Sequence, residues 1–137
     1  MSTGTPQVID SSVAFKWFDF TEPGADTALA LLRGHQRDSI ALCAPAHLPL
    51  EVVTALSCRR VSVAEVDRAI AFLAYADLLI APVDDALLKD AARISHAEGI
   101  ALYDAAFIAL AAALDAELVT ADRKQAATRS CRVRLIG

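Results

Sequence analysis

The stretch Gln7-Val8-Ile9-Asp10-Ser11-Ser12 predicts a short buried strand that ends at a carboxylate and is followed by two hydroxyl side chains. Either serine can cap a short helix over residues 13–18. Further short apolar segments occupy residues 40–43, 78–81, 117–120 and 132–136, and helical segments separate them. Because short apolar strands spaced by helices form a parallel sheet covered on both faces, the chain predicts an α/β fold. Its central parallel sheet should have four to five short strands flanked by helices.

The expected helices have recognisable start and stop signals. Ser62-Val63-Ala64-Glu65 is a capping box, and Asp84 can cap a helix that Gly99 ends. Pro45 and Pro49 flank the start of a helix that runs to about residue 60. Other helices are expected over residues 25–33, 103–114 and 123–128. No internal repeat or linker divides the sequence, so residues 1–137 are expected to form a single domain.

The composition favours a folded protein with a real core. The chain has 137 residues, of which 55% are hydrophobic, and its mean hydropathy is +0.42. The longest apolar run, Ala105 to Leu114, is about half the ~20 residues that a membrane helix needs, so a buried helix is expected there and no membrane contact. The N-terminus shows no secretory signal, and Cys43, Cys58 and Cys131 are odd in number and far apart. These features predict a protein of the reducing cytoplasm.

Four carboxylates lie at the ends or within the first turns of apolar segments: Asp10, Glu51, Asp104 and Asp122. The first three have no Lys or Arg within four residues. A carboxylate among apolar neighbours costs several kcal/mol, as an order of magnitude, unless a positive charge meets it. Ligands of parallel sheets bind beyond the carboxyl ends of the strands, where Asp10 and Asp122 are expected. We therefore expect a shared site for a hard divalent cation, Mg²⁺ or Mn²⁺.

Each acid also has a purely structural alternative. Asp10 can cap the helix that follows it, and Asp104 can be an N-cap. Glu51 can pair with a distant arginine, and Asp122 can pair with Arg123 or Lys124. These two basic residues can in turn contact a phosphate next to the site, or they can simply be solvated surface.

Other classes of site lack their motifs. The five glycines form no dinucleotide-binding or P-loop pattern, and His35, His47 and His96 are too scattered for a zinc motif. The net charge of −4 is unlike that of a typical basic nucleic-acid binder. Chemistry on a phosphate through oxygen-bound cations remains the best match.

The segments Val8–Ser12, Leu50–Leu56, Tyr103–Phe107 and Val119–Asp122 resemble, in order and spacing, the four signature blocks of PIN domains. The short form of the chain resembles the VapC toxins of bacterial toxin–antitoxin pairs. The resemblance implies a three-layer fold and a Mg²⁺- or Mn²⁺-dependent endoribonuclease that hydrolyses RNA phosphodiester bonds. It also implies a homodimer that a cognate antitoxin protein silences.

The resemblance assigns roles to individual residues. Asp10, Glu51, Asp104 and Asp122 match the catalytic, metal-binding acids, and Ser11 and Thr120 match supporting hydroxyl residues. Many relatives have Asn where this chain has Thr54, which weakens the expected support of Glu51. That departure leaves open a non-catalytic PIN-like interaction module as an alternative function. A phosphatase or receiver-like domain is a further alternative, although no D-x-D follows the first strand.

Overall fold

The computed structural model describes residues 4–137 and contains one five-stranded sheet in the order β3-β2-β1-β4-β5. All neighbouring strands are parallel, and β1 lies at the centre, with Val8 opposite Cys43 on one side and Leu118 on the other. The strands are β1 Thr5–Ile9, β2 Ile40–Pro45, β3 Leu79–Ala81, β4 Glu117–Thr120 and β5 Val133–Leu135. The predicted α/β fold with a central parallel sheet is confirmed.

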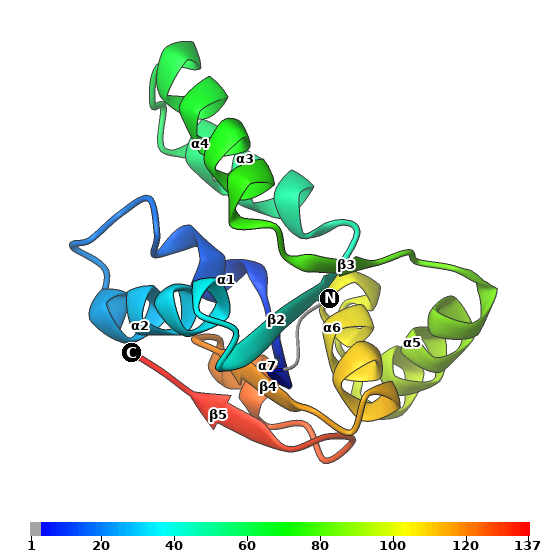
Figure 1. Cartoon of the computed structure of the whole chain (residues 1–137). Coiled ribbons are helices and arrows are strands. Elements are labelled where there is room, and N and C mark those ends of the chain that lie inside the picture. Colours follow the sequence, from blue (N-terminus) through cyan, green and yellow to red (C-terminus); the bar gives the residue numbers. More distant parts are fainter. Residues whose placement is uncertain (1–3) are drawn as a thin grey trace.

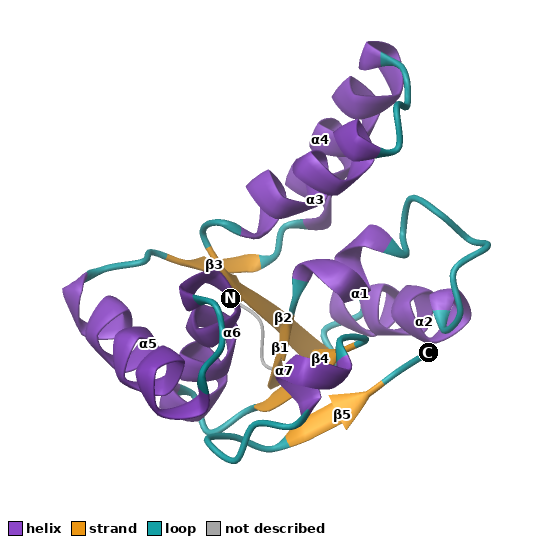
Figure 2. Ribbon diagram, turned by 180° about the vertical axis from the view of Figure 1, so that it is seen from behind, coloured by secondary structure: helices purple, strands orange, loops and turns teal. Residues whose placement is uncertain are grey.

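Helices cover both faces of this sheet (Figure 1). The helices are α1 Ser11–Phe15, α2 Ala25–Gln36, α3 Leu48–Cys58, α4 Val63–Ala76, α5 Asp85–Glu98, α6 Leu102–Ala113 and α7 Arg123–Ala126. Figure 2 shows α1 and α2 on one side of the sheet and α5 and α6 on the other, which gives three layers. The α3–α4 pair projects away from the body of the molecule.

The core lies on both sides of β1. Val8 and Ile9 are fully buried, and so is most of α6, where residues 105–111 are all at most 6% exposed. The apolar run of α6 is thus explained by contact with β1, β2 and β4. Among the described residues no single helix is both long and apolar enough to cross a membrane; α5 and α6 meet that requirement only together, with a bend of 115° between them.

Three local predictions are wrong in detail. Neither serine caps α1; Asp10 does so, as the structural alternative for this acid expected, because its side chain accepts a hydrogen bond from the Val13 N–H. Strand β2 extends beyond the expected residues 40–43 to Pro45, which lies opposite Ala81 at the end of the strand. Ala101, and not Asp104, is the N-cap residue of α6.

Candidate functional site

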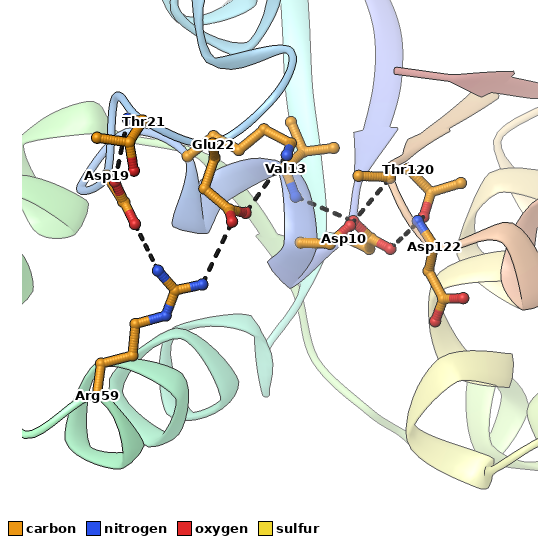
Figure 3. Close-up of polar contacts among 11 residues, drawn as sticks. Asp10, Val13, Asp19, Thr21, Glu22, Arg59, Thr120 and Asp122 are labelled. Atoms are coloured by element: carbon orange, nitrogen blue, oxygen red, sulfur yellow. Dashed lines mark hydrogen bonds and ion pairs between the residues drawn. The ribbon is translucent and has the colours of Figure 1, made fainter. Parts of the chain in front are cut away.

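Asp10 directly follows the central strand β1, at the edge of the sheet where the parallel strands end, and its hydrogen bonds connect α1 with β4. Its side chain is buried, and Oδ1 accepts hydrogen bonds from the Ser12 hydroxyl at 2.5 Å and the Val13 N–H at 3.2 Å. Oδ2 accepts from the Thr120 hydroxyl at 2.5 Å. Figure 3 shows Asp10 between Val13 of α1 and Thr120 of β4, with Asp122 beside them. The first acid is therefore held by both the helix that follows β1 and the neighbouring strand.

Burial is the main cause that raises the pKa of Asp10. It raises the pKa of this carboxyl group from 3.8 to about 6, against the lowering effect of the Ser12, Thr120 and Val13 hydrogen bonds. The negative charge of Asp122 raises the pKa further. A buried carboxylate of this kind is destabilised until a positive charge comes close to it.

Glu51 and Asp104 approach the same edge from two helices. Glu51 lies on α3, where the Ser11 hydroxyl donates to its Oε1 at 3.0 Å. Asp104 lies in the first turn of α6, and both side chains are partly buried. Burial is the main cause that raises the pKa of each carboxyl group. Like-charge repulsion adds to it, from Asp104 at Glu51 and from Asp122 at Asp104.

Asp122 connects the acids electrostatically. It is the N-cap residue of α7, and its Oδ1 accepts a hydrogen bond from the Lys124 N–H at 2.8 Å. Its charge acts on both Asp10 and Asp104, and that of Asp104 acts on Glu51. The fold therefore brings all four predicted acids into one chain of repulsive interactions at the carboxyl edge of the sheet.

Within residues 4–137, none of these four acids forms an ion pair with a basic side chain. Arg59 is an arginine that could have paired with them, because it reaches back toward α1 (Figure 3). It pairs instead with Asp19 at 2.5 Å and Glu22 at 3.3 Å. The structural alternatives that relied on an arginine for Glu51, or on an ion pair for Asp122, are not seen.

The donor set fits a hard cation by its chemistry. It consists of carboxylate oxygens, which Mg²⁺ and Mn²⁺ prefer. No three acidic, histidine or cysteine side chains of the described residues stand close enough together to hold an ion as they are oriented. Binding would require the partly exposed side chains of Glu51, Asp104 or Asp122 to turn toward Asp10.

The predicted supporting and phosphate-binding residues take different places. Ser11 contacts Glu51, and Thr120 contacts Asp10. Thr54 does not support Glu51, because its hydroxyl donates to the backbone carbonyl of Leu50 at 2.7 Å. This is the usual alternative for a threonine within a helix. Arg123 and Lys124 are exposed on α7, directly after Asp122.

Sequence reasoning missed two polar residues near the acids. The Nε2 atom of His47 lies 2.9 Å from the Tyr103 carbonyl, and the charge of His47 lowers the pKa of both Glu51 and Asp104. Its position four residues before Glu51 on α3 was a usable signal, since such residues share a helix face. Gln125 is buried between α6 and β4, and no local pattern indicates its role.

Comparisons with known proteins agree with this architecture. A model of the PIN domain family matches residues 8–130. The structure of PAE2754 from Pyrobaculum aerophilum is 19% identical with a TM-score of 0.66, over 96% of this chain and 92% of that one. The structure of VapBC2 from Rickettsia felis bound to a DNA fragment from their promoter is 13% identical with a TM-score of 0.70, over 97% and 100%. No curated protein sequence matches the chain.

Proposed function

The chain belongs to the PIN domain family, and from that membership we propose that it is a Mg²⁺- or Mn²⁺-dependent endoribonuclease, the toxin of a toxin–antitoxin pair. Asp10 is the observation that carries the proposal. Its carboxyl group is buried, repelled by a second acid and without a basic partner among the described residues. Its role as the N-cap of α1 does not require a charged group, since a neutral serine or asparagine caps a helix as well.

The four acids would share the work of holding the cation. When bound, a divalent cation would supply positive charge that offsets the negative charge of an RNA phosphodiester, so that water could attack the phosphorus more easily. Ser12 and Thr120 fix the two oxygens of Asp10, and Ser11 orients Glu51. These hydroxyl groups would reduce the number of side-chain orientations that metal binding must restrict.

A surface groove of about 440 Å³ runs past Glu51 and offers room for an RNA strand. It is lined by Ser11, Leu50, Glu51, Thr54, Ala55 and Tyr103. Arg123 and Lys124 are proposed to contact RNA phosphates on the other side of the acids. Since the chain as a whole carries a net charge of −4, RNA binding would depend on the local positive charge of Arg123 and Lys124.

Protein partners are proposed for the surface of α4 and β3. A groove of about 390 Å³ there is lined by Pro49, Ile70, Leu73, Ala74, Asp77, Leu78 and Ile80. Tyr75 is 79% exposed close by, and β3 is an edge strand with Leu79 and Ile80 nearly half exposed. Apolar surface of this kind marks protein interfaces. It supports both a cognate antitoxin and a second copy of the chain as partners.

The cytoplasm is the proposed compartment. Cys43, Cys58 and Cys131 are all free thiols in the structure. Thiols that remain unpaired are typical of proteins from a reducing environment. This supports an RNA substrate inside the cell.

An RNA cleavage assay with an Asp10→Asn variant tests the activity. The substitution removes one charge while it keeps the shape of the side chain, so cleavage in Mn²⁺ should be abolished and growth arrest in cells relieved. The circular dichroism spectrum should not change. Asp85→Asn is the matched control, because Asp85 is an exposed acid of α5, a helix that carries none of the four acids and does not line the proposed partner groove. Full cleavage by the Asp10→Asn protein, purified free of host nucleases, would refute the mechanism.

The second candidate function is a non-catalytic interaction module. It is favoured by the engagement of Thr54 with Leu50 and by the absence, among the described residues, of three acids grouped to hold an ion. A titration with Mn²⁺ separates the two functions. The nuclease should gain thermal stability with the metal, and the module should not.

A further inference from the structure

Gln125 is a polar side chain in a place where polar side chains are rare. It lies on the four-residue helix α7 and is 2% exposed. Its Nε2 group donates a hydrogen bond to the backbone carbonyl of Asp104 at 3.0 Å. Its Oε1 lies 3.2 Å from the hydroxyl oxygen of Thr120. The amide nitrogen is therefore hydrogen-bonded, and the amide oxygen shares the Thr120 hydroxyl with Asp10.

These contacts connect three elements that carry candidate acids. Asp104 is in the first turn of α6, Thr120 ends β4, and Asp122 caps the helix to which Gln125 belongs. Among residues 4–137, the Gln125–Asp104 contact is the one hydrogen bond between α6 and α7. A single amide thus makes the hydrogen-bonded connection between the helix that carries Asp104 and the helix that Asp122 caps.

The Thr120 hydroxyl links the same amide to Asp10. This oxygen accepts a hydrogen bond from the Asp122 N–H at 3.0 Å. It has a single hydrogen to donate, and both Asp10 Oδ2 and Gln125 Oε1 lie within reach of it. The orientation of the Thr120 hydroxyl, which fixes the second oxygen of Asp10, is therefore coupled to the position of Gln125.

We propose that Gln125 is a positioning residue of the metal site: it holds the backbone of Asp104 and of Asp122 beside Asp10, so that their side chains can turn toward a shared cation. This inference rests on the proposed function, because it assumes that the acids bind a metal. It adds a residue that does not touch the ion and acts through the Asp104 backbone and the Thr120 hydroxyl. Loss of such outer contacts lowers metal affinity by about 10- to 100-fold.

The test is a Mn²⁺ titration of the full chain followed by thermal unfolding. The stability rises with the logarithm of one plus the ratio of Mn²⁺ concentration to Kd, so the data yield Kd, the midpoint concentration at which half of the native sites are filled. Gln125→Met keeps the length of the side chain but removes both hydrogen bonds. Its midpoint concentration should rise by about tenfold or more. Gln7→Met is the matched control, because Gln7 lies on β1 and its buried Oε1 has no hydrogen-bond partner among residues 4–137. The midpoint of the control should not change.

A second variant and a metal-free measurement separate positioning from stability. Gln125→Asn keeps the amide, but its side chain is too short to reach both partners. This variant should also raise the Mn²⁺ midpoint concentration. It decides the question if the methionine variant does not fold. Urea unfolding without metal gives the loss of stability alone. An unchanged Mn²⁺ midpoint in either folded variant overturns the inference, even if that variant is less stable. An unsubstituted protein that does not respond to Mn²⁺ overturns the proposed function, and this inference with it.

Discussion

Replacing Asp10 by asparagine should make the metal-free protein more stable at neutral pH. The carboxyl group is buried and its pKa is raised from 3.8 to about 6, so the ionised form opposes folding. Asparagine is never ionised and resembles the protonated acid. Its Oδ1 can still accept from Val13, and its amide can donate to Thr120, whose hydroxyl is then free to donate to Gln125.

The size of the effect follows from the shift in pKa. A group whose pKa is higher in the folded state holds its proton there while the unfolded chain loses it. The stability of the parent protein should therefore fall as the pH rises from about 4 to about 6, and level off above that. A shift of about two pKa units corresponds to about 3 kcal/mol, which is the expected upper limit of the difference at pH 8.

The assay is urea unfolding of the Asp10→Asn variant and the parent protein at several pH values between 4 and 8, with metal removed by chelation. The difference in unfolding free energy isolates Asp10, since all other groups titrate in both proteins. It should be near zero at pH 4 and favour the variant at pH 8. Mn²⁺ should reverse the order by stabilising the parent more. A difference that does not vary with pH, or a variant that is less stable at pH 8, would show that Asp10 is not destabilised by burial.

Three further outcomes are expected. Asp104→Asn should leave the melting temperature of the metal-free protein unchanged or raised, because burial and Asp122 both disfavour the Asp104 carboxylate, and it should weaken the response to Mn²⁺ in the same melting experiment. Arg123→Ala should lower the slope of log affinity against log salt for single-stranded RNA by about 0.7, measured by fluorescence anisotropy; an unchanged slope would exclude a phosphate contact. His35→Phe should cost about 1 to 3 kcal/mol in urea unfolding, because the buried N–H of Leu42 loses the Nδ1 atom that accepts its hydrogen bond, and no loss would contradict this role.

The elements with strong local signals were predicted with correct bounds. Helix α5 runs over Asp85–Glu98, with Asp84 as N-cap and Gly99 in the left-handed conformation at its end, as the sequence indicated. Strand β4 also has the expected bounds. In both cases the signal is local, because a cap, a glycine or a short apolar run depends on its immediate neighbours.

The errors occur where contacts between elements distant in the sequence determine the cap of a helix or the end of a strand. The side chain of Asp10 competes with those of Ser11 and Ser12 for the first turn of α1, and the serines are used instead by Glu51 and by the N–H of Ala121. Nothing in the local sequence shows those partners. Pro45 can end β2 because it lies at the last paired position of the strand.

The residues of the candidate site also fall into those that the sequence predicted and those that only the folded structure shows. The four acids were identified from their apolar surroundings and from their resemblance to PIN domains. The role of Gln125 could not be predicted, because its partner Asp104 lies 21 positions away and α7 is too short to define a buried face. The direction of the Thr54 hydroxyl toward Leu50 likewise becomes visible only in the folded helix.

The central place of β1 in the sheet has a consequence for the timing of synthesis. One neighbour of β1 is β4, and the Thr120 hydroxyl that fixes Asp10 comes 110 positions later in the chain. At 5–20 residues per second, a ribosome needs roughly 6 to 20 s to travel that distance. During this interval the growing chain has β1 exposed along one edge and an incomplete set of acids. An activity that needs all four acids therefore cannot arise before the chain has been made as far as Asp122 and β4 has paired with β1.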